Sequence, residues 1–250
     1  MSKKGTLYLL PTPIGDKINL ELIRDYELII RKIGLFVVEE IRTIRRFLVS
    51  INCKDLIDAS EFIIWNEHSD RSEISKIIDV LNSGLNVGIM SEAGMPCIAD
   101  PGEEIVAAAH RNKIKVVPVV GSSSIILALA ASGLNGEAFV YHGYLPVDSS
   151  KRKQALLEIS TDIEKTSRTH IFIEAPYRND KMIESIVSTS ASQQVLCVAV
   201  SLQTDDEIIK AQKVEKWKNF EGSFHKRPAI FLIGKEIKAV ENYFNILRKL

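Results

Sequence analysis

Short apolar runs that alternate with amphipathic segments constrain the fold of this sequence more than any other feature. Residues 7–10, 35–38 and 86–90 are such runs, and turn residues bound each of them. A short apolar run between turn residues is typical of a strand buried on both faces. Strands that alternate with helices over short connections form a parallel sheet covered on both faces. We therefore expect an α/β fold.

The length and the hydrophobic content of the chain allow two modest cores. The chain has 250 residues, of which 46% are hydrophobic, and single domains commonly contain ~100–200 residues. We expect an N-terminal α/β domain with a parallel sheet over residues 1–118 and a C-terminal α/β domain with a mixed sheet over residues 119–250. Within the second domain, the pattern predicts a helix or an arm at 207–217, a last strand at 229–233 and a closing amphipathic helix at 237–247.

Charge and cysteine content narrow the class of protein. The formal net charge is zero, so a polyanionic partner must be bound by a local basic patch. Cys53, Cys97 and Cys197 are odd in number and widely separated, which favours a reduced, cytoplasmic protein. No Cys and His residues have the spacing of zinc ligands, so we expect no metal site. The apolar run before Pro11 lacks a cleavage site and indicates a strand, and the longest uncharged apolar segment, at 125–131, is too short to span a bilayer.

The segment at 91–102 is the strongest candidate for a ligand-binding loop. It follows the predicted strand at 86–90, and ligands of open parallel sheets bind at the carboxyl ends of the strands. Most such connections have about 2–6 residues, and this one is longer. An ordinary connection is the alternative, in which Asp100 caps the next helix and Pro101 occupies its first position.

Loops after the other predicted strands carry further candidates. Those that we single out are Gly15, Glu39, Glu40, His68, Glu92, Gly94, Ser122 and Glu174. Because the carboxyl ends of parallel strands meet at one edge of a sheet, we expect these residues along one rim. The alternative for Glu39 and Glu40 is a solvated helix start, and a lone loop histidine such as His68 is more often a surface residue. Ser122–Ser124 either cap the following helix or hold a ligand oxygen. Signatures of dinucleotide-binding, P-loop, zinc-protease and α/β-hydrolase enzymes are absent from the sequence.

Several blocks of the sequence occur in the order and spacing of one family. They are Pro11-Thr12-Pro13-Ile14-Gly15, Val38-Glu39-Glu40-Ile41-Arg42, Asn66-Glu67-His68, Ser91-Glu92-Ala93-Gly94-Met95-Pro96, Ala99-Asp100-Pro101-Gly102, Val117-Pro118, Gly121-Ser122-Ser123, Ala131-Ser132-Gly133-Leu134, Gly143-Tyr144-Leu145-Pro146 and Glu174-Ala175-Pro176-Tyr177-Arg178. On these blocks the chain resembles the tetrapyrrole-methylase-like S-adenosylmethionine methyltransferases. Within them, it resembles most the branch that 2′-O-methylates a cytidine of small-subunit ribosomal RNA.

The resemblance implies two α/β domains with S-adenosyl-L-methionine in the cleft between them, and a homodimer. Carried over by position, it implies that the cofactor is bound by Pro11, Ile14, Gly15, Ser91, Glu92, Gly94, Met95, Pro96, Ser123, Ser124, Ile125, Glu174, Ala175, Pro228 and Ala229. A sulfonium cation is favoured near carboxylates and backbone carbonyls. Methyl transfer is a one-step in-line displacement, so the enzyme mainly aligns the reacting atoms and excludes water.

An acceptor ribose hydroxyl must lose its proton, and several side chains are candidates to accept it. These candidate bases are Glu39, Glu40, His68 and Glu174. Arg42 or Arg178 would orient a phosphate or a catalytic carboxylate. We assign catalysis to Glu39, Arg42 and His68. A tetrapyrrole carbon as acceptor requires fewer protein bases.

The sequence also departs from the pattern of the ribosomal RNA branch. The branch has Glu-Asp-Thr-Arg where this chain has residues 39–42, and Ser-Asp-Ala-Gly where it has residues 91–94. Its Arg-Glu-Leu-Thr-Lys element is replaced by Val200-Ser201-Leu202-Gln203-Thr204, without the cation and the carboxylate. Basic clusters at 151–153 and 225–227 are either phosphate-binding or solvated surface. Ribosomal RNA is therefore the first candidate acceptor. A tetrapyrrole or another small molecule is the second, and a catalytically inactive cofactor-binding protein is the third reading.

Overall fold

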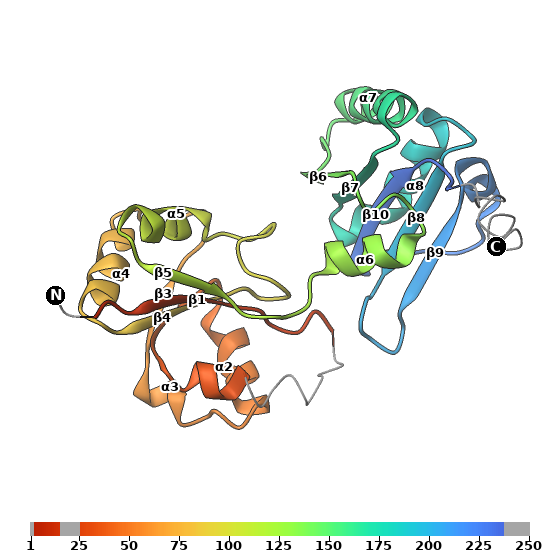
Figure 1. Ribbon diagram of the computed structural model, residues 1–250. Helices are drawn as coiled ribbons and strands as arrows, with labels where there is room; N and C mark the ends of the chain where they lie inside the picture. Colours follow the sequence, from red (N-terminus) through yellow and green to blue (C-terminus); the bar gives the residue numbers. More distant parts are fainter. Residues whose placement is uncertain (1–2, 16–25, 238–250) are drawn as a thin grey trace, which may run out of the picture. The chain divides into compact units, whose positions relative to one another are not determined.

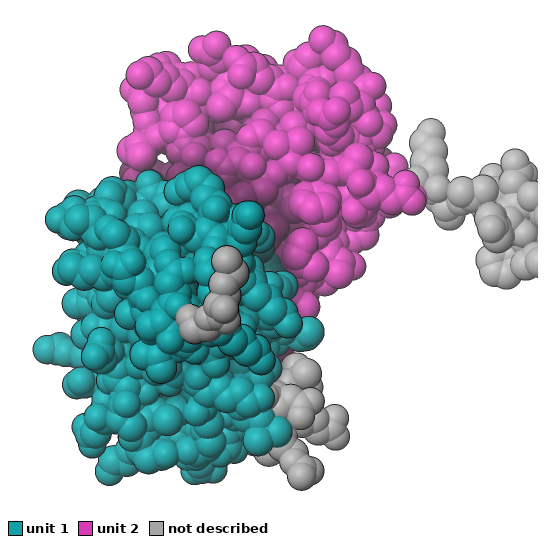
Figure 2. Space-filling model, turned by 60° about the vertical axis from the view of Figure 1, so that its left-hand side comes forward, with its two compact units in different colours: residues 1–123 teal, residues 124–250 magenta. Residues whose placement is uncertain are grey.

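The structure is a computed structural model that describes residues 3–15 and 26–237. The chain divides into two compact units, Met1–Ser123 and Ser124–Leu250, which Figure 2 distinguishes by colour. Each unit contains a five-stranded sheet with helices packed on it, so the predicted α/β class is confirmed. No helix of the described residues has both the length and the apolar character needed to cross a membrane.

The sheet of unit 1 is entirely parallel. Its strands are β1 (Thr6–Leu10), β2 (Ile33–Val38), β3 (Glu61–Ile64), β4 (Asn86–Met90) and β5 (Lys115–Pro118). They lie in the order β3-β2-β4-β1-β5. The carboxyl ends of β2, β4 and β1 are therefore adjacent, and the loops that follow these three strands start side by side.

Helices cover both faces of this sheet. They are α2 (Ile41–Ser50), α3 (Leu56–Ala59), α4 (Glu73–Asn82) and α5 (Glu103–Arg111). Figure 1 shows α4 and α5 on one face and α2 and α3 on the other. Successive residues of a strand point to opposite faces: Val37 packs with Ile77 of α4, whereas Phe36 and Val38 pack with Ile44 of α2. Burial on both faces explains why these strands are apolar at nearly every position.

Unit 2 contains a mixed sheet. Its strands are β6 (Phe139–Tyr144), β7 (Thr169–Ile173), β8 (Val195–Val200), β9 (Ile208–Lys213) and β10 (Ala229–Gly234). The order is β6-β7-β10-β8-β9, and only β6 and β7 are parallel. The helices are α6 (Ser124–Ser132), α7 (Ser149–Thr166) and α8 (Asn179–Thr189), with the short 3₁₀ helices η1 (Pro176–Arg178) and η2 (Val214–Asn219). The main core joins α7 and α8 to β7, β8 and β10, and α6 lies on the side of the sheet away from α7 (Figure 1).

Three predictions of local structure need correction or fall outside the described residues. The helix or arm predicted at 207–217 was wrong, because β9 pairs with β8 along its whole length and η2 follows it. In this edge strand Ile208 and Ile209 are exposed whereas Lys210, Gln212 and Lys213 are half-buried, so the sequence lacks the alternation of apolar and polar residues that marks a half-buried strand. Apolar residues at helical spacing over 20–33 predict a helix that Gly34 ends, but Gly34 lies inside β2. Most of the predicted closing helix, residues 238–247, lies outside the described residues.

Candidate functional site

The loops after β1 and β4 are bonded to each other. Thr12 N donates to Gly94 O at 2.9 Å, and Gly94 N donates to Thr12 O at 3.0 Å. The Thr12 hydroxyl donates to Ser91 O at 3.1 Å, and the Ser91 hydroxyl donates to Gly94 O at 2.8 Å. Both hydroxyl side chains are buried, so these bonds are shielded from water and fix the two loops as one unit. Pro11, Ser91 and Gly94, predicted to bind the cofactor, are thereby brought together.

Two glycines allow these loops to approach each other and the segment after β5. Gly94 has a φ of +90°, and a Cβ there would lie 3.0 Å from the Ile14 side chain and 3.3 Å from Ser122 O. A Cβ on Gly121 would lie 2.1 Å from the Pro11 ring. A side chain at either position would therefore push the loops apart. The other predicted residues of these segments, Gly15, Glu92, Met95, Pro96 and Ser123, lie on the same three loops.

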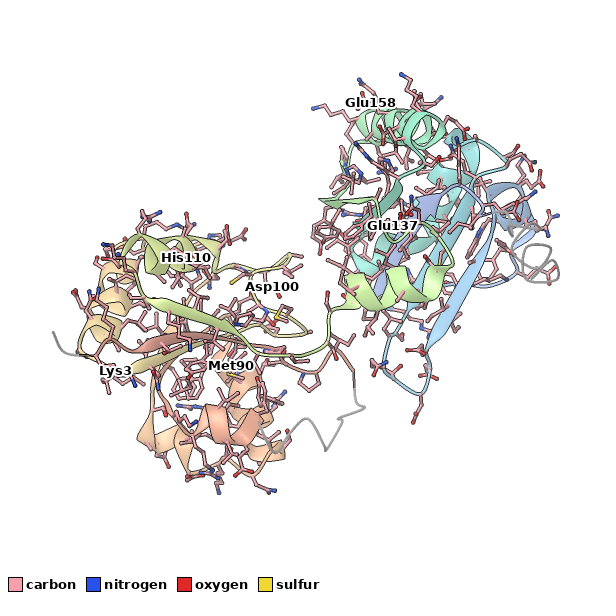
Figure 3. All side chains as sticks on the ribbon, viewed as in Figure 1. Lys3, Met90, Asp100, His110, Glu137 and Glu158 are labelled. Atoms are coloured by element: carbon pink, nitrogen blue, oxygen red, sulfur yellow. The ribbon has the colours of Figure 1, made fainter. Side chains whose placement is uncertain are left out.

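Three carboxylates interact at the carboxyl ends of β2 and β4. Burial raises the pKa of Glu39 to about 7, and the charges of Asp100 and Glu92 contribute to that shift. Burial, followed by the charge of Glu92, raises the pKa of Asp100 to about 6. Figure 3 shows Met90, at the end of β4, and Asp100 at the end of unit 1 away from Lys3. We name Glu39, Glu92 and Asp100 the carboxylate cluster; it favours a bound cation, and Glu39 is able to accept a proton near neutral pH.

The position of Asp100 differs from the one expected. In the alternative interpretation of this segment, Asp100 caps a helix that begins at Pro101, but α5 begins at Glu103 with Gly102 as its N-cap. Gly102 has a φ of +133°, and Cys97 and Ala99 also have positive φ angles. Asp100 and Pro101 therefore lie in the loop before the helix, flanked by positions with positive φ. This correction places Asp100 in the carboxylate cluster instead of at a helix cap.

A cavity of about 520 Å³ opens between the segment after β3 and the end of the loop before α5. Its walls include Trp65, Arg71 and Asp100. The Arg71 guanidinium lies 5.1 Å from the centre of the Trp65 ring, and its Nε lies 2.7 Å from a carboxylate oxygen of Glu104. The volume is within the ~300–1,000 Å³ of ligand pockets. Sequence reasoning assigned no role to Trp65 or Arg71, because their proximity to the loop before α5 depends on the tertiary fold.

The other predicted catalytic residues have different surroundings. His68 follows the edge strand β3, and its side chain is 85% exposed and lies 3.4 Å from Glu67. Glu40 is exposed and caps α2, because its carboxylate accepts a hydrogen bond of 2.9 Å from Arg42 N. Arg42 is exposed in the first turn of α2. The structure thus brings Glu39 to Glu92 and Asp100 and places the side chains of His68 and Arg42 at the surface. Within residues 3–15 and 26–237, no group of three or more His, Cys, Asp or Glu side chains is arranged to hold a metal ion.

In unit 2, four of the predicted cofactor-binding residues gather at one edge of the sheet. Glu174 and Ala175 follow β7, and Pro228 and Ala229 lie at the start of β10, whose Ile230 is paired with Ile173. The Glu174 side chain is 2% exposed. It accepts hydrogen bonds from Arg178 Nε at 2.9 Å, from Arg178 Nη2 at 2.5 Å and from Ala175 N at 2.7 Å. Its carboxylate is therefore neutralised by a fixed cation.

The remaining predicted residues lie at the start of α6. Ser124 is the first residue of this helix, and Ile125 is buried. Ser122, Ser123 and Ser124 are half-buried. The first N–H groups of a helix are available to an oxygen ligand unless a side chain caps them, so both interpretations of these serines stay open.

Comparison with known proteins relates the chain to methylases. The sequence model of the family described as tetrapyrrole (corrin/porphyrin) methylases matches residues 21–216. The ribosomal RNA small subunit methyltransferase I of Vibrio cholerae is 34% identical over 205 residues, which cover 82% of this chain and 67% of that protein. The protein of the same name from Halalkalibacterium halodurans is 32% identical, over 83% of this chain and 68% of its own length. The one from Buchnera aphidicola subsp. Schizaphis graminum is 29% identical, over 97% of this chain and 82% of its own length.

Solved structures give the same relation at the level of the fold. The methyltransferase CobJ superposes with a TM-score of 0.60 at 11% sequence identity and covers 92% of this chain and 94% of its own. A cobalt precorrin-4 methyltransferase of cobalamin biosynthesis superposes with a TM-score of 0.54 at 15% identity, with the same coverage of 92% and 94%. At these identities the likeness establishes the fold alone, and it confirms the predicted fold class.

Proposed function

We propose, from the premise that this chain belongs to the tetrapyrrole (corrin/porphyrin) methylase family, that its methyl acceptor is a ribose hydroxyl of small-subunit ribosomal RNA. Membership of the family makes the chain a methyltransferase that uses S-adenosyl-L-methionine. The relatives reported above act, by their names, on ribosomal RNA of the small subunit. They match more than four fifths of this chain, which supports the same acceptor here.

The observation that carries a hydroxyl acceptor is the environment of Glu39. A ribose hydroxyl must give up its proton when its oxygen attacks the methyl carbon, and Glu39, with a pKa of about 7, is suited to accept it. Burial is the main cause of that raised pKa, and the charges of Asp100 and Glu92 add to it. We assign Glu39 as the general base and the other two carboxylates as positioning residues. An acceptor carbon of a tetrapyrrole would not require such a base.

The residues of unit 1 also fit the cofactor. S-adenosyl-L-methionine supplies an electrophilic methyl group on a sulfonium cation. The carboxylate cluster favours that cation, and the loops joined through Thr12, Ser91 and Gly94 present backbone groups without a Cβ at the closest point. We propose that these loops of unit 1 bind the cofactor.

One observation favours a second acceptor, a tetrapyrrole or another small molecule. Residues Val200–Thr204 lack the cation and the carboxylate of the ribosomal RNA branch. They form a turn in which Ser201 and Gln203 have positive φ angles and Gln203 N donates to the Glu207 carboxylate at 2.8 Å. The cation and the carboxylate that the branch has in this element are therefore not available to an RNA substrate here.

Transfer of a labelled methyl group tests the proposal. Purified protein is incubated with labelled S-adenosyl-L-methionine and small ribosomal subunits from cells that lack this chain, and in parallel with a panel of porphyrinoids. We expect label in the ribosomal RNA, at a ribose that becomes resistant to alkaline cleavage. Label in a porphyrinoid alone would replace RNA with the second acceptor. Tight cofactor binding by calorimetry without transfer to any acceptor would favour the catalytically inactive reading.

We also propose that the protein acts in the cytoplasm as a homodimer. The resemblance to the family supports the dimer, and a ribosomal acceptor supports the compartment. Sedimentation equilibrium of the full chain tests the first point, and a mass near 28 kDa would contradict it.

A further inference from the structure

Two exposed tyrosines lie at the carboxyl ends of β6 and β7. Tyr144 is the last residue of β6 and is paired in register with Ile173, the last residue of β7. Tyr177 lies in η1, which begins three residues after β7 ends. Tyr144 is 62% exposed and Tyr177 is 59% exposed. Large aromatic side chains this exposed, and this close along one sheet edge, indicate a surface that binds a partner.

An arginine is fixed beside Tyr177. The Arg178 guanidinium lies 5.2 Å from the centre of the Tyr177 ring, and its Nη1 donates to the Tyr177 hydroxyl at 3.2 Å. The double hydrogen bond to the buried Glu174 raises the pKa of Arg178, and Tyr177 and Tyr144 contribute to the shift. Both tyrosines therefore lie within electrostatic reach of the guanidinium. Because Glu174 is buried, it holds the cation without exposing its own negative charge.

A basic segment adjoins the same place. Lys226 N donates to Pro176 O at 2.9 Å, which sets the exposed segment 225–226 against η1. The Asp180 carboxylate accepts from the Ser223 hydroxyl at 2.6 Å and from Phe224 N at 2.8 Å. This acid is thus engaged in holding the segment in place. The surface around Tyr177 therefore combines flat aromatic rings and the guanidinium plane of Arg178 with the positive charge of Lys226.

We propose that Tyr144, Tyr177 and Arg178 form a stacking surface that binds an unpaired nucleobase of the RNA, with Lys226 at the neighbouring phosphate. This inference rests on the proposed function and names the part of the chain that recognises the RNA. Every nucleobase has a flat face that stacks on an aromatic ring or on a guanidinium plane, and Lys side chains neutralise the backbone. The proposal also explains how a chain of zero net charge binds a polyanion, because the cations are local and their buried counter-charge is not presented to the RNA.

The test compares variants in direct RNA binding and in methyl transfer. Each variant of the full chain is titrated against a fluorescent single-stranded fragment of small-subunit ribosomal RNA. We expect the Y144A/Y177A double variant to bind this RNA between about 5-fold and 150-fold more weakly for each base that it fails to stack. The Y144F/Y177F variant keeps both rings and stays within about threefold of the wild type. F139A removes a ring that is 41% exposed at the other end of β6, and it is expected to leave RNA affinity unchanged.

Two further readouts separate stacking from a structural effect. Calorimetric affinity for S-adenosyl-L-methionine checks that Y144A/Y177A retains its fold. K226A is expected to reduce the slope of log affinity against log salt by roughly one phosphate contact. A wild type that methylates ribosomal RNA while Y144A/Y177A binds and methylates it equally well would overturn the stacking surface alone.

The opposite combination separates the inference from the proposed function. If the wild type transfers no methyl group to ribosomal RNA but binds single-stranded RNA, and Y144A/Y177A does not, then the surface is supported and the acceptor is wrong. If the wild type binds no RNA and Y144A/Y177A loses affinity for a porphyrinoid instead, the flat ligand is a tetrapyrrole and the inference fails.

Discussion

Glu39 in unit 1 and Glu174 in unit 2 occupy the same topological place and have opposite surroundings. Each directly follows the carboxyl end of a strand, β2 or β7. Glu39 faces two further carboxylates, and its pKa is raised to about 7. Glu174 is buried and bonded twice to Arg178. Position at a strand end therefore does not determine what a carboxylate does. Burial, with two other acids nearby, makes Glu39 a proton acceptor, whereas the bonded guanidinium makes Glu174 an anchor for a cation.

The substitution Glu39→Gln tests the first half of this comparison and has the largest expected effect. Removal of a general base typically costs 10²- to 10⁴-fold in rate, so we expect kcat for transfer to ribosomal RNA to fall by about that factor. The affinity for S-adenosyl-L-methionine, measured by calorimetry, should change by less than about threefold, because two carboxylates remain near the cation. Glu40→Gln is the matched control: its amide keeps an oxygen for the cap of α2, and activity should be retained. A fully active Glu39→Gln would remove the proposed base.

The substitution Arg178→Ala tests the second half. It leaves the Glu174 carboxylate, 2% exposed, without its cation, and breaking a buried pair in this way costs about 3–5 kcal/mol. We expect a loss near the lower figure in the free energy of unfolding, because Ala175 N still donates to the carboxylate. Urea denaturation measures it. The double variant with Glu174→Gln should recover part of the loss; an Arg178→Ala single variant as stable as the wild type would show that Glu174 does not depend on the cation.

The pH dependence of stability should sharpen the contrast. The folded-state pKa values of Glu39 and Asp100, about 7 and about 6, lie above their ordinary values of 4.5 and 3.8. The unfolded chain therefore releases these protons at a lower pH than the folded chain. Ionisation of either group destabilises the folded state. Stability should fall as the pH rises from about 4 to about 7, by about 1 kcal/mol after allowance for solvent screening of these half-exposed groups.

Denaturation of the wild type and of the Glu39→Gln/Asp100→Asn variant across this pH range measures the effect. The variant should be the more stable protein at pH 8, and its stability should change less over the interval. Activity has the opposite trend, because a general base must be deprotonated: kcat/KM for RNA should rise through pH 7. Equal slopes for the two proteins would mean that the carboxylates do not interact as their surroundings indicate.

The sequence predicts a feature of this site only where the local residue pattern determines it, and not where the feature depends on the order of the strands in the sheet. The buried strands of unit 1 are apolar at nearly every position, so local pattern is enough to find them. The carboxylate cluster requires that β2 lie beside β4 although β3 comes between them in the sequence. Asp100 was misplaced because Asp-Pro followed by an acid also suits a loop with positive φ angles. β9 was missed because this edge strand is stabilised by its pairing with β8 and not by a pattern of its own side chains.

The position of β10 shows the same limit in unit 2. This last strand enters the sheet between β7 and β8, which places Ala229 opposite Val200 and next to the end of β7. Strand order of this kind depends on packing over the whole unit and leaves no local trace in the sequence. The family resemblance placed Glu174 and Ala229 at one ligand, whereas spacing alone would have kept them apart.

His68 has the smallest expected effect of the residues compared here. It also follows the end of a strand, but its side chain is not buried. Its side chain is 85% exposed, and its nearest charged partner, Glu67, is 84% exposed. A side chain this exposed is not held in a fixed position for proton transfer, so His68→Ala should change kcat by less than about twofold in the methyl transfer assay. A loss as large as that of Glu39→Gln would show that this loop closes over the acceptor, and that the exposed histidine shares the role here given to Glu39 alone.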